Sequence, residues 1–153
     1  MTTIAAVSRA AFVATLLSFE GTPYHHQGRL PGVGLDCPGP LICAAWEHGL
    51  KPRSWDITGY GRVPDGKALQ GFCDAHMERI DWADRLPGDV TLVRFQQGRP
   101  QHLGVLTDTT PQRQYWIEAE GFRYKRVIVN RLMLDRATQL VQLYRVPGLE
   151  VPS

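Results

Sequence analysis

The chain has 153 residues, enough for one compact hydrophobic core and short of what two independent domains usually need. Its hydrophobic fraction of 43% and charged fraction of 21% are ordinary for globular proteins and argue against disorder and against a membrane span. Seventeen Lys and Arg against fifteen Asp and Glu leave a net charge of +2, too small to predict nucleic-acid binding. We therefore expect a single domain over residues 1–153 and no nucleic-acid partner.

The first predicted element is an amphipathic helix over residues 4–17, with Thr2 or Thr3 as its N-cap. Its buried side is expected to comprise Ile4, Val7, Ala11 and Ala14. A secretion signal is disfavoured here, because the basic segment before the apolar run is thin and no A-x-A-like cleavage site follows it.

A loop rich in glycine and proline, GTPYHHQGRLPGVGLDC, occupies residues 21–37 and contains His, Tyr and Cys side chains. A second helix is predicted over about 38–48, ended by Gly49, and a third over about 65–77. Helical spacing predicts that the core-facing residues are Leu41, Ile42, Ala45 and Trp46 in the second helix, and Leu69, Phe72, Cys73 and His76 in the third.

The second half of the chain predicts five short strands, each rich in Val, Leu, Ile or aromatic residues and bounded by turn residues. They are placed at 89–95, 102–107, 115–120, 124–130 and 139–146, with 81–86 linking the two halves of the chain. Short connections favour antiparallel pairing, so a meander or small open barrel is expected. The predicted class is α+β, with N-terminal helices packed on an antiparallel sheet of about five strands.

Cys37 is the most informative cysteine, because the sequence Asp36-Cys37-Pro38-Gly39-Pro40 fixes where the second helix starts. Proline fits only the first turn of a helix and pushes the preceding residue out of helical conformation. We therefore predict Cys37 as the N-cap and Pro38 as the first helical residue. At that position the helix dipole favours a thiolate and nearby backbone N–H groups face a developing oxyanion, which is the local chemistry of a cysteine nucleophile.

The other cysteines and the histidines are then sorted by context. Cys43 and Cys73 lie inside apolar helical patterns and are interpreted as buried structural thiols, and the spacing of the three cysteines does not fit a zinc site. His102 is the candidate general base, because it opens a predicted strand directly after the loop QQGRPQ and can project toward a facing helix start. His48 and His76 are interpreted as structural or solvated.

Several stretches resemble the NlpC/P60 cysteine peptidases, in particular the short versions associated with the tails of phages and gene-transfer agents. They are GTPYHHQGRLPGVGLDCPG, PGDVTLVRF, HLGVLTD, YWIEAEG and YRVPG, in the family's order and at its spacing. The resemblance implies a papain-like core in which Cys37 attacks a carbonyl, His102 activates the thiol and a third polar group orients the imidazole. It implies neither a metal nor an organic cofactor.

The resemblance also implies roles for residues around this pair. Glu118 occupies a position that commonly holds a histidine in the family, and it is the candidate residue for orienting the imidazole of His102. Glu120 lies on the same face of the strand and is the reserve candidate, with a solvated surface carboxylate as the alternative. Tyr24 corresponds to a tyrosine that points toward the oxyanion in related enzymes, and the alternative is an aromatic ring packed beneath the loop.

Three polar residues in the loop before the nucleophile complete the candidate site. Asp36 matches the residue before the family's nucleophile and is expected to tie the loop through hydrogen bonds rather than to react. His25 and His26 are assigned either to the substrate groove or to a solvated loop.

By resemblance, the substrate is the stem peptide of peptidoglycan, cleaved next to D-glutamate and diaminopimelate through a thioester acyl-enzyme. The resemblance further implies a component of the virion tail that reaches the host cell envelope with the particle and contacts tail-tip or baseplate proteins. Two other hypotheses stay open. One is a weak or inactive tail-tip or assembly subunit that keeps the fold, and the other is an acyltransferase or amidase that uses the same thiol.

Overall fold

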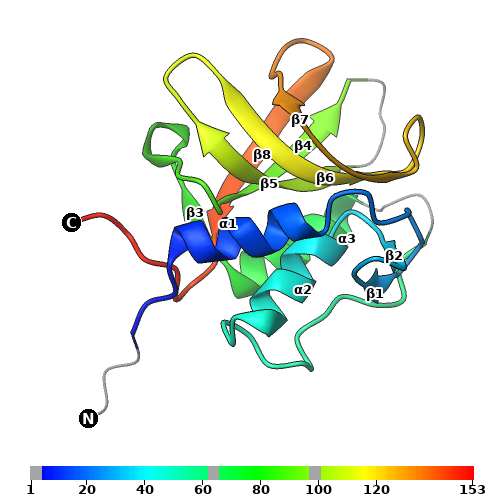
Figure 1. Cartoon of the computed structure of the whole chain (residues 1–153). Coiled ribbons are helices and arrows are strands. Elements are labelled where there is room, and N and C mark those ends of the chain that lie inside the picture. Colours follow the sequence, from blue (N-terminus) through cyan, green and yellow to red (C-terminus); the bar gives the residue numbers. More distant parts are fainter. Residues whose placement is uncertain (1–4, 62–65, 97–100) are drawn as a thin grey trace.

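The computed structural model describes residues 5–61, 66–96 and 101–153, in which helices cover one face of an antiparallel sheet (Figure 1). The helices of this part of the chain are α1 (Arg9–Ser18), α2 (Gly39–Glu47) and α3 (Gly66–His76). The sheet contains β3 (Glu78–Ile80), β4 (Val90–Phe95), β5 (His102–Thr109), β6 (Gln114–Glu120), β7 (Arg126–Leu132) and β8 (Thr138–Arg145). Its spatial order is β3-β8-β4-β5-β6-β7, and every neighbouring pair is antiparallel. The predicted α+β class is confirmed.

The sheet has one strand more than the sequence predicts. The five predicted strands are present with ends shifted by up to two residues, and β3 adds a sixth strand by pairing with β8. Strand β3 has only three residues and no fully buried side chain, so its sequence carries no alternating pattern to reveal it. The predicted link at 81–86 contains a short 3₁₀ helix, η1 (Trp82–Asp84).

The loop at residues 21–37 is also more regular than predicted. It contains a small hairpin of β1 (Arg29–Leu30) and β2 (Gly34–Leu35). Strands of two residues are too short to produce a periodic pattern, and glycine and proline hide them further.

Helix α1 begins later than predicted and buries a different face. Its N-cap is Ser8, whose hydroxyl accepts the backbone N–H of Ala11, while the proposed caps Thr2 and Thr3 lie outside the described residues. The buried residues are Arg9, Phe12, Val13 and Leu16, whereas Ala11 and Ala14 are exposed.

A buried charge explains why the face of α1 was misassigned. The Arg9 guanidinium lies 3.0 Å from Asp89, a fully buried carboxylate that is also paired with Arg145 at 2.8 Å. A charge compensated in this way can lie on the core side of a helix, which a hydrophobicity pattern does not register. Segments from the two halves of the chain meet beside this cluster, where Val7 forms a bridge with Leu149.

Helix α2 starts one residue later than predicted, with Pro38 rather than Cys37 as its N-cap. The Gly39 N–H donates to the Asp36 carbonyl at 2.9 Å, so a tight turn over Cys37 and Pro38 precedes the helix. The helical ladder then begins with the Ile42 N–H bonded to the Pro38 carbonyl at 3.1 Å. Cys37 therefore lies immediately before the N-cap, still at the positive end of the helix.

Two apolar clusters hold the elements together. The larger lies between the helices and the sheet, and its fully buried residues include Phe12, Leu16, Leu41, Ile42, Leu103, Ile117 and Tyr144. The smaller contains Val93, Leu106, Trp116, Leu132 and Leu143. Because strand side chains alternate between faces, adjacent residues such as Trp116 and Ile117 belong to different clusters. No helix in the described part of the chain is long and apolar enough to cross a membrane.

Candidate active site

The structure brings Cys37, His102 and Glu118 together from three separate elements. Cys37 lies just before α2, His102 is the first residue of β5, and Glu118 lies in the middle of β6. The His102 ring hydrogen-bonds the Cys37 side chain, and its Nε2 atom lies 3.4 Å from Oε2 of Glu118. Cys37 and Glu118 are each 6% exposed, so the thiol, the imidazole and the carboxylate form a largely enclosed polar row.

The His102 ring is held from the side by aromatic packing. It lies 6.0 Å from the ring of Phe95 and 5.6 Å from the ring of Trp116, edge-on to the latter. Trp116 reaches this position because Gly104 has no side chain, since a Cβ atom there would overlap the indole ring. Cys37 belongs to the larger apolar cluster and these aromatic residues to the smaller one, so the row forms where the two clusters meet.

The environment of His102 favours the protonated ring. Burial lowers the pKa of His102, but hydrogen bonds and charge interactions with Cys37 and Glu118 outweigh burial and raise the pKa to about 10. The raised pKa of His102 favours an imidazolium at neutral pH, placed between a sulfur and a carboxylate. This arrangement can hold a thiolate ready for attack and a proton ready for a leaving group.

Asp36, directly before the nucleophile, is the centre of a buried hydrogen-bond network. It is 1% exposed and accepts the Gln27 backbone N–H at 2.7 Å, the Arg29 guanidinium at 2.7 Å and the Tyr60 hydroxyl. Arg29 also donates to Asp56 at 2.9 Å and to the Tyr60 oxygen at 2.9 Å. The network ties the loop before Cys37 to the segment around Tyr60.

The charges of this network stabilise one another. Burial opposes the charge of Arg29, but Asp36 and Tyr60 outweigh it and raise its pKa. Burial and the hydrogen bond to Asp36 raise the pKa of Tyr60, so its hydroxyl remains a donor. Sequence analysis predicted hydrogen bonds at Asp36 but missed Arg29 and Tyr60, whose partners are determined only by the folded chain.

Glu118 and Glu120 have different partners. Glu120 accepts the backbone N–H groups of Phe122, Arg123 and Tyr124 at 2.5–3.0 Å and so closes the turn between β6 and β7. Burial works against this carboxylate, yet the amide hydrogen bonds lower the pKa of Glu120 below its usual value. Only Glu118 of the two contacts the His102 ring.

Tyr24, His25 and His26 lie along the loop that leads to Cys37. Tyr24 is half-buried, and its ring packs on Gly121, where an added Cβ would come within 3.0 Å of it. His25 is exposed, with Nδ1 3.0 Å from the His26 carbonyl. The His26 ring lies edge-on to Tyr60 at 5.4 Å.

The remaining cysteines lie in the core. Burial raises the pKa of Cys43 to about 11 and that of Cys73 to about 12, so both are neutral thiols at ordinary pH. The Cys43 thiol donates to the Arg29 carbonyl at 3.4 Å. In the described part of the chain, no group of three His, Cys, Asp or Glu side chains is arranged to hold a metal ion.

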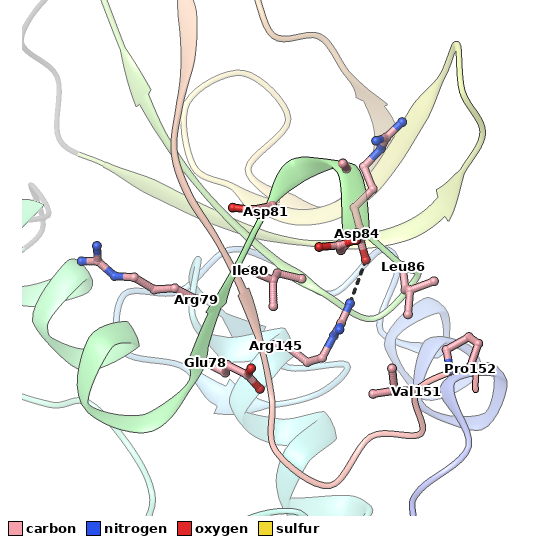
Figure 2. A pocket seen from close by; sticks show the side chains of 11 residues that line it. Glu78, Arg79, Ile80, Asp81, Asp84, Leu86, Arg145, Val151 and Pro152 are labelled. Atoms are coloured by element: carbon pink, nitrogen blue, oxygen red, sulfur yellow. Dashed lines mark hydrogen bonds between the residues drawn. The ribbon is translucent and has the colours of Figure 1, made fainter.

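An open groove of about 590 Å³ lies elsewhere on the surface, between β3, η1 and the C-terminal segment (Figure 2). Arg145 crosses one side of it and donates to the Asp84 carbonyl at 2.9 Å. None of its lining residues belongs to the Cys37, His102 and Glu118 row. The groove is therefore separate from the candidate active site.

Comparison with known proteins supports the fold. No family profile matches the chain, and no curated protein matches its sequence. Among solved structures, the chain is similar to a Staphylococcus aureus protein described as similar to lipoprotein, NLP/P60 family, with a TM-score of 0.58 and 15% identity. The similarity covers 95% of this chain and 45% of that one, so the chain spans less than half its length. The chain thus has an NlpC/P60-like α+β fold.

Proposed function

We propose that the protein is a cysteine peptidase of the NlpC/P60 type that hydrolyses amide bonds in peptidoglycan stem peptides, next to D-glutamate and diaminopimelate. The observation that carries this proposal is the row of Cys37, His102 and Glu118, with the imidazole bonded to both partners. The NlpC/P60-like fold supports it. Fold similarity alone would not be sufficient, because one fold serves many activities.

The proposed reaction uses the two nitrogens of His102 differently. Nε2 faces Glu118, which leaves Nδ1 to take the proton of Cys37. The thiolate attacks the scissile carbonyl, and the imidazolium then gives its proton to the departing amine, leaving a thioester on Cys37. Water attacks the thioester as the neutral imidazole takes its proton, and the carboxylic acid product and the free thiol are released. Glu118 stabilises the imidazolium through both halves of the reaction.

Prolines restrict where the oxyanion is held. Pro38 and Pro40 have no N–H to donate, and the Gly39 N–H is bonded to the Asp36 carbonyl. The Cys37 backbone N–H is therefore the proposed main-chain donor to the tetrahedral intermediate, and the resemblance adds the Tyr24 hydroxyl as a second proposed donor.

The test is release of new amine termini from purified peptidoglycan, with fragments assigned by mass spectrometry. Wild-type protein is expected to release peptides, and Cys37→Ala to release none. Cys43→Ala is the matched control, because it removes a buried thiol outside the catalytic row. A folded wild-type protein without activity on peptidoglycan would exclude the peptidase function.

We also propose that the protein acts as a tail-tip component of a phage or gene-transfer agent, on the strength of the sequence stretches quoted above. Purified particles are then expected to contain the chain together with tail proteins. An inert protein that is built into particles would instead support the assembly-subunit hypothesis. Its absence from purified particles would contradict both tail roles and leave the peptidase activity to be judged separately.

A further inference from the structure

The turn after β6 and the first residue of β7 form an exposed basic and aromatic surface. Its sequence is Phe122-Arg123-Tyr124-Lys125-Arg126, and all five residues are exposed, Phe122 by 73%. None of the salt bridges in the described part of the chain involves its three cations. An uncompensated cluster of this kind favours an anionic ligand.

The turn is held in place by internal contacts. The Glu120 carboxylate accepts three consecutive backbone N–H groups of the turn, and the Tyr24 ring packs on Gly121. The Tyr24 N–H donates to the Lys125 carbonyl at 2.8 Å, and Pro23 pairs with Arg126. Side chains on such an anchored turn lose less conformational freedom on binding than those on a loose loop.

Strand register places Arg126 beside the catalytic row. Arg126 pairs with Glu120, and Ile128 pairs with Glu118. Paired residues in an antiparallel sheet point to the same face, so Arg126 and Glu118 are diagonal neighbours on one face, with Cα atoms roughly 7–8 Å apart. Glu118 in turn contacts His102.

The residue opposite Arg126 does not neutralise it. Glu120 directs its carboxylate to the backbone amides of the turn, at distances down to 2.5 Å. A guanidinium without an acidic partner offers paired donors that match the two oxygens of a carboxylate. Arg126 is thus an exposed guanidinium on the strand face that also carries Glu118.

We infer that Arg126 is a specificity-determining residue that binds a carboxylate of the substrate next to the scissile bond. Arg123 and Lys125 add to the positive field, and Phe122 and Tyr124 supply apolar contact area. The inference rests on the proposed function, because stem peptides carry the free carboxylates of D-glutamate and diaminopimelate. The chemical class of the preferred substrate is therefore an acidic peptide, and amidation of its carboxylates weakens recognition.

The test compares two synthetic stem peptides, one with free carboxylates and one with the same groups amidated. Wild-type protein is expected to show a higher kcat/KM for the acidic peptide. Arg126→Ala is expected to raise KM for the acidic peptide roughly tenfold or more, leave kcat close to wild type, and barely affect the amidated peptide. Arg126→Lys is expected to recover part of the loss.

Arg131→Ala is the matched control, since Arg131 is an exposed arginine on the same strand whose side chain points to the opposite face. It is expected to leave both substrates unaffected. Equal losses on the two peptides with Arg126→Ala, or no loss on either, would overturn the inference.

A binding measurement separates this inference from the peptidase function. Calorimetric titration of Cys37→Ala with both peptides reports recognition without turnover. Tighter binding of the acidic peptide that disappears in Cys37→Ala/Arg126→Ala supports the subsite even if the wild type cleaves neither peptide. Equal affinity for the two peptides refutes the subsite even if the wild type is active.

Discussion

His102 and Glu118 lie on different strands, β5 and β6, yet Nε2 of the imidazole is 3.4 Å from Oε2 of the carboxylate. Together with the hydrogen bond between the ring and Cys37, which has the larger effect, this contact raises the pKa of His102. A carboxylate at the third position carries a negative charge where a neutral side chain would carry none, so it stabilises the imidazolium and, through it, the thiolate. The reactivity of the Cys37 thiol therefore depends on the charge of Glu118 as well as on the imidazole of His102.

The first prediction concerns the alkaline limb of the pH–activity profile. Because the pKa of His102 is raised to about 10, the wild type is expected to retain its imidazolium, and hence its activity, up to about pH 10. Glu118→Gln removes one of the causes of the raised pKa and is expected to move the alkaline limb to lower pH. The measurement is kcat/KM for stem-peptide hydrolysis as a function of pH, because this ratio reports the pKa values of the free enzyme.

Glu120→Gln is the control for Glu118→Gln, because Glu120 contacts the turn rather than the imidazole. It is expected to leave the alkaline limb in place. Identical profiles for the wild type and Glu118→Gln would show that Glu118 does not set the charge state of His102.

The second prediction concerns stability and follows from the same pKa. The folded pKa of His102, about 10, lies above the value of about 6.5 for an unperturbed imidazole. Protonation therefore stabilises the fold fully below about pH 6.5, and this contribution is lost as pH rises toward 10, on the order of a few kcal/mol. Urea unfolding at pH 6 and pH 10 should show a larger drop for the wild type than for His102→Gln. Equal drops would contradict a proton held by the fold.

The sequence predicted the class of fold better than it predicted local boundaries, and the catalytic roles of Cys37 and His102 stay predictions. Regular alternation revealed the five longer strands, whereas β3 is too short to show a pattern. Two prolines located the start of α2 to within one residue, but the turn closed by Asp36 and Gly39 moved the N-cap to Pro38. Local patterns predict elements, while tertiary hydrogen bonds set their ends.

The partners of the buried charges could not be predicted from the sequence. Arg9 pairs with Asp89, and Arg29 pairs with Asp36, through contacts that only the folded chain creates. The choice between Glu118 and Glu120 was open for a similar reason. The two share a strand face, and the backbone conformation of the following turn decides which carboxylate is captured by amides.

The third prediction concerns Gly104, which makes room for the Trp116 ring that packs against His102. Gly104→Ala is expected to displace that ring, to destabilise the protein by about 1–3 kcal/mol and to lower kcat by misplacing the imidazole. Gly71→Ala is the control, because an added Cβ there meets nothing within 4 Å inside α3 and is expected to stabilise by about 0.5–1 kcal/mol. Urea unfolding and peptide hydrolysis measure the two effects. A Gly104→Ala protein with unchanged kcat would show that the ring does not position His102.

The fourth prediction ranks the members of the network before the nucleophile. Asp36→Ala removes the carboxylate that three donors share and leaves the largely buried Arg29 guanidinium with one carboxylate partner instead of two, and is expected to destabilise by about 3–5 kcal/mol. Tyr60→Phe removes one hydroxyl donor while Arg29 remains paired, and is expected to cost only about 1 kcal/mol. Both substitutions remove hydrogen bonds that hold the loop before Cys37. The rate of alkylation by iodoacetamide is therefore expected to change more for Cys37 than for Cys43. Urea unfolding gives the ranking, and a larger loss for Tyr60→Phe than for Asp36→Ala would mean that Asp36 is not the centre of the network.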